Sequence, residues 1–388
     1  MNRVLIVVAF ASFVSSLFIR MTDPLVPLIA ADMAVETSTA ALLGTAFALP
    51  WALMQPILGP LGDLLGKTRV ILVCMSILFV GAMVGAFAES FPVLVVARVI
   101  SGAAAGGVFP VSMAVYGDMV PVAQRQVGMG RLLTASISGM LMGGALAGIL
   151  ADFVPWRWIF VIFGAGVAVT LALAIFALRK VPISPPRPLQ IAAMVNNYRQ
   201  VWSNPLAKVC YGAVFLEGIV LVGLFPFVAV LLVSIGEPRP SIAGVILAAF
   251  PLGGVIYALT VNRLVSNFSI YSLMIFGGGA AAAMLLVQAF VPPWPVQVAV
   301  FFVMGFGFYL LHGCIIVQMT ELAPDARGTA TAGHALAYFS GQAIGPIVYA
   351  LGFAAIGPSP TIVVAAVIMA LIGYVSARLL HGGKAQPT

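Results

Sequence analysis

Charged residues are scarce in this chain. Only 7% of its 388 residues are Asp, Glu, Lys or Arg, whereas roughly 25% are charged in an ordinary soluble domain. So few charges cannot cover a water-facing surface, and we infer that lipid is the main solvent of this chain. Its three cysteines, Cys74, Cys210 and Cys314, lie in or beside apolar runs without paired or metal-ligand spacing. We interpret them as small buried apolar side chains and expect no metal site.

Long apolar runs make up most of the chain, which is 62% hydrophobic with a mean hydropathy of +1.14. A bilayer core of about 30 Å requires about 20 apolar residues per helix, and backbone groups in lipid must be paired internally. The runs do not alternate as the strands of a membrane barrel do. We therefore predict an all-α membrane protein with twelve transmembrane helices. The predicted spans are residues 4–30, 38–60, 68–88, 92–118, 126–150, 156–179, 206–233, 240–262, 269–291, 296–319, 328–352 and 360–381.

Lysine and arginine are unevenly divided between the two sides of these spans. With the N-terminus on the cytoplasmic side, fourteen of them lie on that side and only Arg157 and Arg239 on the other. The positive-inside rule therefore predicts that both termini are cytoplasmic. Because the basic residues lie in short gaps between apolar runs, the net charge of +7 does not indicate a nucleic-acid partner.

The longest hydrophilic stretch, residues 179–208, contains five prolines and five basic residues. It divides the chain into a six-helix bundle in residues 1–180, a cytoplasmic linker in residues 181–205 and a second six-helix bundle in residues 206–388. Similar connections follow the fourth and the tenth spans, which indicates that the two bundles are homologous. Two such halves are the layout of many secondary transporters, whose sites lie near the membrane midplane.

The connection between the second and third spans, GPLGDLLGKTR (residues 59–69), carries a specific motif. It resembles the signature of the major facilitator superfamily, Gly-x-Leu-Ala/Gly-Asp-Arg/Lys-x-Gly-Arg/Lys, although Leu64 replaces a basic residue. The resemblance implies that this loop helps to hold the outward-facing state, with Asp63 facing the region after Arg327. The matching residues are Gly59, Leu61, Gly62, Asp63, Gly66 and Lys67, and Arg69 adds a second cation on the cytoplasmic side.

Two further stretches resemble the twelve-helix drug:proton antiporter branch of that superfamily. Residues 95–107 are similar to its fourth-helix motif Arg-x-x-Gln-Gly, with Ser101 in place of the glutamine. Residues 138–148 are similar to its glycine-rich fifth-helix motif, in which Gly144 replaces a proline. The resemblance implies a monomer in the bacterial inner membrane that moves protons and a small organic substrate without a cofactor. The fifth-helix matches are Gly139, Gly143 and Gly148.

Four ionisable side chains fall deep inside the predicted spans, where a charge costs at least about 2.5–3.5 kcal/mol. By resemblance, spans one and four both line the central cavity. Asp23 and Arg98 lie at similar depths in these two spans, so we expect them to meet, with Arg20 one turn from Asp23 on the same face. Pro24 and Pro27 remove helix donors and predict a broken helix at the cavity wall. The four ionisable residues are Arg20, Asp23, Arg98 and Glu217.

Glu217 lies near the middle of span seven and has no basic neighbour in the sequence. We predict that Glu217 binds and releases the coupling proton, with Asp23 as the alternative. Arg20 is predicted to bind an anionic group of the substrate, and Arg98 either to bind such a group or to modulate protonation. His312 in span ten lies at cavity depth and is a further candidate for this network. A charge network that only locks the helices together is the alternative for these residues.

These features favour a proton-coupled exporter of a small, amphipathic organic compound. Proton-coupled uptake of an organic anion is the alternative, because two arginines lie inside the membrane and the fifth-helix motif is incomplete. Sodium coupling stays open, since one acid with backbone carbonyls could bind that ion. An enzyme is disfavoured, because no Ser/His/Asp set lies at one depth and no metal-ligand cluster is present. The sequence shows no nucleotide-binding loop, and this disfavours ATP-driven export.

Overall fold

The computed structural model describes residues 3–119, 122–178, 191–321 and 327–380, and every regular element in these ranges is a helix. Twelve segments in these ranges are long and apolar enough to span a membrane. Eleven of them lie within five residues of the predicted limits. The apolar part of the fifth begins later than predicted, at Thr134. The predicted all-α membrane fold with twelve spans is confirmed.

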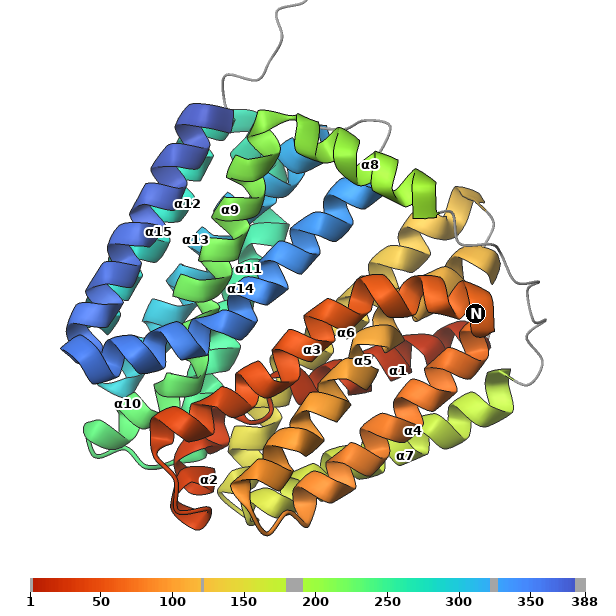
Figure 1. Ribbon diagram of the computed structural model, residues 1–388. Helices are drawn as coiled ribbons and strands as arrows, with labels where there is room; N and C mark the ends of the chain where they lie inside the picture. The colour runs from red at the N-terminus through yellow and green to blue at the C-terminus, as the bar shows by residue number, and fades with distance from the viewer. Residues whose placement is uncertain (1–2, 120–121, 179–190, 322–326, 381–388) are drawn as a thin grey trace, which may run out of the picture. The chain divides into compact units, whose positions relative to one another are not determined.

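The contacts divide the chain into two compact units, and the first comprises Met1–Leu189 with Arg239–Gly244. Helix α5 packs between α3 and α4, whereas α1 packs against α6 and α7, and α4 lies beside α7 (Figure 1). The elements of this first unit, unit 1, are α1 (Arg3–Arg20), η1 (Asp23–Leu25), α2 (Val26–Asp32), α3 (Thr37–Leu65), α4 (Lys67–Ala86), α5 (Phe91–Met119), α6 (Val122–Ala151) and α7 (Trp156–Leu178).

The second unit comprises Gln190–Pro238 with Val245–Thr388. Helix α9 packs against α14 and α15, and α12 packs against α13 and α15. An additional helix, α8, lies across the end of this unit at which α9 begins (Figure 1), in a stretch for which we predicted only a linker. The elements are α8 (Ile191–Ser203), α9 (Pro205–Val220), η2 (Val222–Phe227), α10 (Val228–Ser234), α11 (Pro240–Asn267), α12 (Ile270–Gln288), α13 (Trp294–Glu321), α14 (Arg327–Ile356) and α15 (Pro358–Leu380).

The first membrane span of each unit is interrupted by a 3-10 turn. In unit 1 the turn η1 separates α1 from α2 at Pro24, which confirms the predicted break. In unit 2 the turn η2 separates α9 from α10 and contains Pro226. Because proline has no backbone N–H, each one leaves an upstream carbonyl without its helical partner. The second break was not predicted from the sequence.

The same close helix contact occurs in both units. A Cβ on Gly139 of α6 would lie 2.1 Å from the carbonyl oxygen of Phe13 in α1, and a Cβ on Gly341 of α14 would lie 2.0 Å from that of Phe215 in α9. A shift of 202 residues takes Gly139 to Gly341 and Phe13 to Phe215. Small residues permit such backbone approach between membrane helices. This matched pair of contacts supports the predicted homology of the two bundles.

Candidate functional site

A buried acid and a histidine meet inside unit 2. Asn204 caps the start of α9, accepting a hydrogen bond from the Leu206 N–H, and the helix places Glu217 three residues before its end. Helix α13 places His312 opposite, with 2.7 Å between its Nδ1 and Oε2 of Glu217. The Glu217 side chain is fully buried, and that of His312 is 11% exposed. Among the described residues, Oε1 of Glu217 has no hydrogen-bond partner.

The 2.7 Å contact between Glu217 and His312 defines the charge states that this pair can adopt. Two lone pairs cannot face each other at this distance, so one proton must lie between Nδ1 and Oε2. With only that proton the pair carries a charge of −1. With a second proton, on Nε2 of His312, the pair is neutral. The pair can therefore take up and release one proton at Nε2 while its hydrogen bond persists.

Aromatic rings surround the His312 side chain. Its ring centroid lies 4.8 Å from those of Phe308, Tyr338 and His334. The ring of Phe308 in turn packs against Phe250 at 5.4 Å. Rings that pack at 4.5–7 Å hold one another in place, so this cluster orients the imidazole toward Glu217. Neither the contact with Glu217 nor the one with His334 was predicted from the sequence.

The three ionisable residues predicted in unit 1 also lie close together. Nη1 of Arg20 lies 3.3 Å from Oδ2 of Asp23, as expected for residues one turn apart. All three side chains are buried, with Asp23 and Arg98 each only 1% exposed. No ion pair between Asp23 and Arg98 is present in this described part of unit 1, although the two attract each other electrostatically. Oδ1 of Asp23 lacks a hydrogen-bond partner among the described residues.

Arg98 binds the backbone at the end of α1 instead of a carboxylate. Its Nη1 donates to the Phe18 carbonyl at 2.9 Å, and its Nε donates to the Leu43 carbonyl of α3 at 3.3 Å. Its Nη2 donates to the Thr22 hydroxyl at 3.4 Å. The last four carbonyls of a helix have no intrahelical partner, and α1 ends at Arg20. Arg98 therefore caps the broken helix and ties it to α3.

Replacing Arg98 with methionine is expected to lower the thermal stability of the protein. The Phe18 and Leu43 carbonyls would lose a charged donor, and a buried unsatisfied polar group costs about 1–3 kcal/mol. Lysine at this position would restore little of the loss, because it lacks the planar fork of donors. The apparent Tm of the detergent-solubilised protein measures the effect, with the same exchange at exposed Arg263 as the control. Unchanged stability combined with lost substrate binding would contradict the capping role and favour the predicted substrate role.

The loop motif of residues 59–69 forms the tight turn between α3 and α4. Gly66 joins the two helices with a φ of 94°, a conformation that favours glycine. Next to it, Nζ of Lys67 lies 2.5 Å from Oδ2 of Asp118 near the end of α5, an ion pair that was not predicted. Gly59 and Asp63 lie in the last turns of α3. The side chains of Asp63 and Arg327 are outside the described residues, so the predicted approach of Asp63 to the region after Arg327 stays a prediction.

The glycines of the fifth-helix motif lie on α6. Gly139 and Gly143 face the backbone of α1, where a Cβ on Gly143 would lie 2.0 Å from the Leu17 carbonyl oxygen. Gly148 follows them further along the same helix. Two of the three matched glycines therefore permit the packing of α6 on α1.

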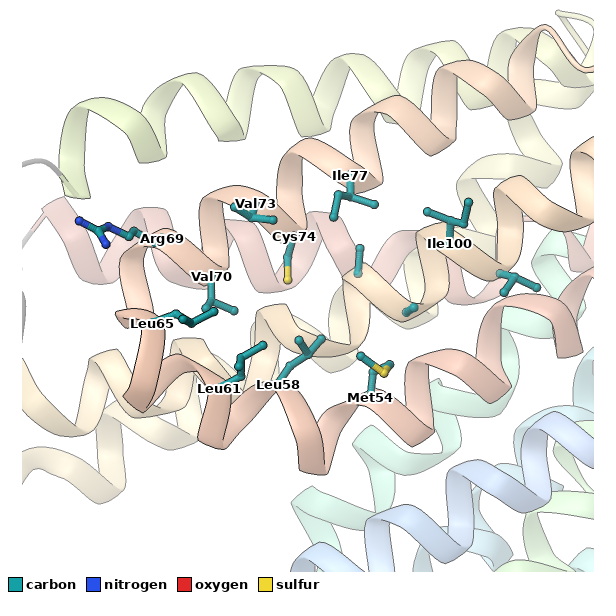
Figure 2. A pocket seen from close by; sticks show the side chains of 13 residues that line it. Met54, Leu58, Leu61, Leu65, Arg69, Val70, Val73, Cys74, Ile77 and Ile100 are labelled. Carbon is teal, nitrogen blue, oxygen red and sulfur yellow. The ribbon is translucent and has the colours of Figure 1, made fainter. Parts of the chain in front are cut away.

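An apolar groove of about 560 Å³ lies on unit 1, and none of the buried charged side chains lines it. Its walls are formed by α3, α4 and α5, with Leu58, Leu61 and Leu65 along one side (Figure 2). Arg69 lies at one end, and its guanidinium points away from the apolar side chains (Figure 2). The groove contains none of the residues that were predicted to bind protons, and we therefore do not place the transport site there.

No group of three His, Cys, Asp or Glu side chains that could hold a metal ion occurs in the described ranges. The chemistry of the described interior is that of two separate clusters. One is the Glu217–His312 pair of unit 2, and the other is the Arg20–Asp23 pair with Arg98 in unit 1.

Residues 8–346 match the family model described as the Major Facilitator Superfamily. The match contains both clusters and the loop motif. This chain belongs to the major facilitator superfamily. The predicted family is thereby confirmed, and this major facilitator protein is a multi-pass membrane transporter by family. Members of this family act on small molecules within the membrane, and the family is not a class of enzymes.

Curated relatives match this major facilitator protein over most of their length. It is 27% identical over 338 residues to the uncharacterized MFS-type transporter YceJ of Bacillus subtilis, covering 86% of each chain. It is 25% identical over 352 residues to the quinolone resistance protein NorA of Staphylococcus aureus, covering 90% of this chain and 89% of NorA.

Solved structures share the fold at lower identity. A bacterial homolog of the human lysosomal transporter Spinster, in an inward-facing and unoccupied conformation, has a TM-score of 0.75 at 18% identity and covers 99% of this chain and 98% of its own. The peptide transporter POT in complex with sulfate has a TM-score of 0.79 at 15% identity, with coverages of 98% and 95%. These likenesses establish the fold alone.

Proposed function

We propose that this protein is an efflux antiporter that exchanges protons for small amphipathic organic cations across the bacterial inner membrane. The observation that carries the proposal is the buried pair of Glu217 and His312, with 2.7 Å between Oε2 and Nδ1. This pair is either neutral or singly negative, and the two states differ by one proton. Glu217 is thus the proposed site of proton coupling, with His312 as its partner.

The charge of the pair explains how a proton and a cation would compete. A lone negative charge buried in the membrane interior costs free energy. Either a proton on His312 or an organic cation beside the unpartnered Oε1 of Glu217 would neutralise it. A site that accepts one or the other, but not both, couples their movements in opposite directions. One monovalent cation exchanged for one proton moves no net charge.

The aromatic rings near the pair support an amphipathic substrate. Tyr309, Tyr338 and Phe339 are partly exposed, and all three belong to the ring cluster around Phe308 and His312. Aromatic faces attract both flat apolar groups and cations. The name of one relative, a quinolone resistance protein, fits a substrate of this type. The proposed direction is outward, with both termini in the cytoplasm as the positive-inside rule predicts.

Uptake of an organic anion is the second candidate, and the buried cluster of unit 1 favours it. Arg20, Asp23 and Arg98 together carry one net positive charge when all are ionised. However, Arg98 is only 1% exposed and its donors are directed at Phe18, Leu43 and Thr22. An anion would have to displace these partners. The antiporter proposal displaces no hydrogen-bond partner of Glu217, because Oε1 has none among the described residues.

Purified protein in liposomes that contain a pH-sensitive dye tests the proposal. Cationic, neutral and anionic aromatic compounds are added in turn, with the membrane potential clamped by potassium and valinomycin. The proposal expects proton movement only with cations, in the opposite direction to the cation, and at a rate that does not change with membrane potential. Proton movement together with anions would establish the uptake alternative. Coupling to sodium instead of protons would overturn the proposed ion.

A further inference from the structure

We propose that His334 carries the coupling proton between the Glu217–His312 pair and the cytoplasmic side of unit 2. The inference rests on the proposed function, because it needs a proton to be exchanged at the pair. His334 lies on α14 and was not predicted as a site residue. The sequence around it carries no motif that distinguishes it from a structural histidine.

His334 is buried and lacks a hydrogen-bond partner at one ring nitrogen. It is 5% exposed, and its Nε2 has no partner among the described residues. A buried polar group without a partner costs about 1–3 kcal/mol, so a residue with a purely structural role would gain by losing this nitrogen. A nitrogen that accepts a proton during transport must be without a hydrogen-bond partner before the proton arrives.

The ring of His334 packs against the ring of His312. The ring centroids of His312 and His334 are 4.8 Å apart, with 62° between the ring planes. Because Nδ1 of His312 is held by Glu217, the imidazole can gain or lose a proton only at Nε2 while that contact persists. His334 thus supplies an open acceptor nitrogen on a ring that touches His312.

His334 also lies nearer to the start of its helix than the pair does. A Cβ on Gly218, the residue after Glu217, would lie 2.5 Å from the Tyr338 carbonyl oxygen, so Glu217 is close to the level of Tyr338 on α14. His334 is four residues before Tyr338, about 6 Å along the helix toward the end that begins at Arg327. That end is the predicted cytoplasmic one. The three residues therefore form a path from the membrane interior toward the cytoplasm.

Few other titratable groups surround His334. From α9, the Tyr211 hydroxyl donates to the Ala330 carbonyl one turn earlier on α14, at 3.3 Å. From α13 the neighbour is His312, and on α14 itself it is Tyr338, one turn later. In the described part of the helices that pack on α14, the basic residues do not bind His334 through a hydrogen bond or an ion pair. These are Arg199 of α8, Lys208 of α9 and Arg378 of α15.

The proposed step moves one proton and breaks no other bond. In the loaded pair, Nε2 of His312 carries the proton, and Nε2 of His334 accepts it directly or through one water after a small rotation of the ring. The bridging proton stays between Nδ1 and Oε2, so the pair returns to its charge of −1. The His334 imidazolium then releases its proton to water at the cytoplasmic end. Loading of the pair from that side follows the reverse order.

Two substitutions separate this role from a structural one. His334→Phe keeps a ring against His312 but has no nitrogen, and His334→Gln keeps polar atoms but cannot carry a proton. If His334 relays protons, both variants lower the initial rate of proton-driven transport by at least about tenfold, since a positioned proton carrier contributes that much or more. Substrate–substrate exchange, which needs no net proton movement, is expected at the wild-type rate. The number of protons moved per substrate stays unchanged.

Added imidazole buffer is the decisive further measurement, because it can replace a missing proton carrier but cannot repair a packing defect. The relay expects imidazole to restore the proton-driven rate of both variants toward that of the wild type. Loss of exchange together with the proton-driven rate, without rescue, would show a structural role and overturn the relay. Wild-type rates in both variants would also overturn the relay, because they would show that His334 is not needed. If the wild type itself moves no protons, the proposed function fails and the relay fails with it. If coupling is lost in Glu217→Gln but not in the His334 variants, the relay fails and the proposed function stands.

Discussion

The Glu217→Gln variant is expected to build no substrate gradient from a proton gradient. Glutamine keeps the shape of the side chain and can still bind Nδ1 of His312. With glutamine the pair is neutral before any proton arrives, so protonation of the imidazole would create an uncompensated buried charge. The variant is therefore not expected to take up the coupling proton. Substrate–substrate exchange is expected to slow as well, because the neutral pair no longer offers a negative charge to an organic cation.

The size of this effect follows from the stoichiometry. For one proton per monovalent cation, a difference of one pH unit supplies about 1.4 kcal/mol, enough for about a tenfold substrate gradient. The wild type is expected to reach about that ratio in proteoliposomes, and Glu217→Gln to reach none. Labelled substrate inside and outside the vesicles measures the ratio.

Asp23→Asn serves as the matched control for Glu217→Gln. Asp23 is the other buried acid predicted to bind the proton, and it lies in unit 1 beside Arg20. The proposal expects this variant to keep the gradient, even if its stability falls. A gradient that survives in Glu217→Gln and disappears in Asp23→Asn would transfer proton coupling to Asp23.

The fold was predictable from the sequence because lipid imposes a simple rule. Each helix that crosses the membrane must show a run of about 20 apolar residues, and such runs can be counted. The helix break at Pro24 was predictable for a similar reason, since a proline removes a donor wherever it stands. Helix α8 was not predicted, because its polar residues and nearby prolines are equally typical of a linker. The break at η2 was overlooked although Pro226 provides the same signal as Pro24.

The site was only partly predictable, because depth along a helix does not determine the direction of a side chain. Glu217 was identified by its charge alone, but its partner His312 is 95 residues away, and only helix packing brings the two together. Asp23 and Arg98 were expected to meet because they lie at similar depths. Arg98 is instead directed at the carbonyl of Phe18 near the end of α1 and at that of Leu43 inside α3. His334 could not have been identified without the contact to His312.

Gly341→Ala is expected to destabilise the protein although it adds a single methyl group. The new Cβ would lie 2.0 Å from the carbonyl oxygen of Phe215 and 2.9 Å from its carbonyl carbon. Both are backbone atoms of α9, so no side-chain rotation can relieve the clash, and α9 and α14 must move apart. Overpacking of this kind costs about 1–3 kcal/mol, occasionally more. Glu217 would shift with α9, so transport is expected to fall along with stability.

Two glycines at open positions provide the controls for this prediction. Nothing lies within 4 Å of a Cβ built on Gly212 of α9 or on Gly279 of α12. Because alanine favours a helix over glycine by about 0.5–1 kcal/mol, Gly212→Ala and Gly279→Ala are expected to leave the apparent Tm unchanged or to raise it. Gly139→Ala, the counterpart of Gly341→Ala in unit 1, should lower it similarly, because its Cβ would lie 2.1 Å from the Phe13 carbonyl oxygen. Equal Tm values for all four variants would mean that the paired helices do not approach as closely as the two contacts indicate. The argument for a helix contact repeated in both units would then fail.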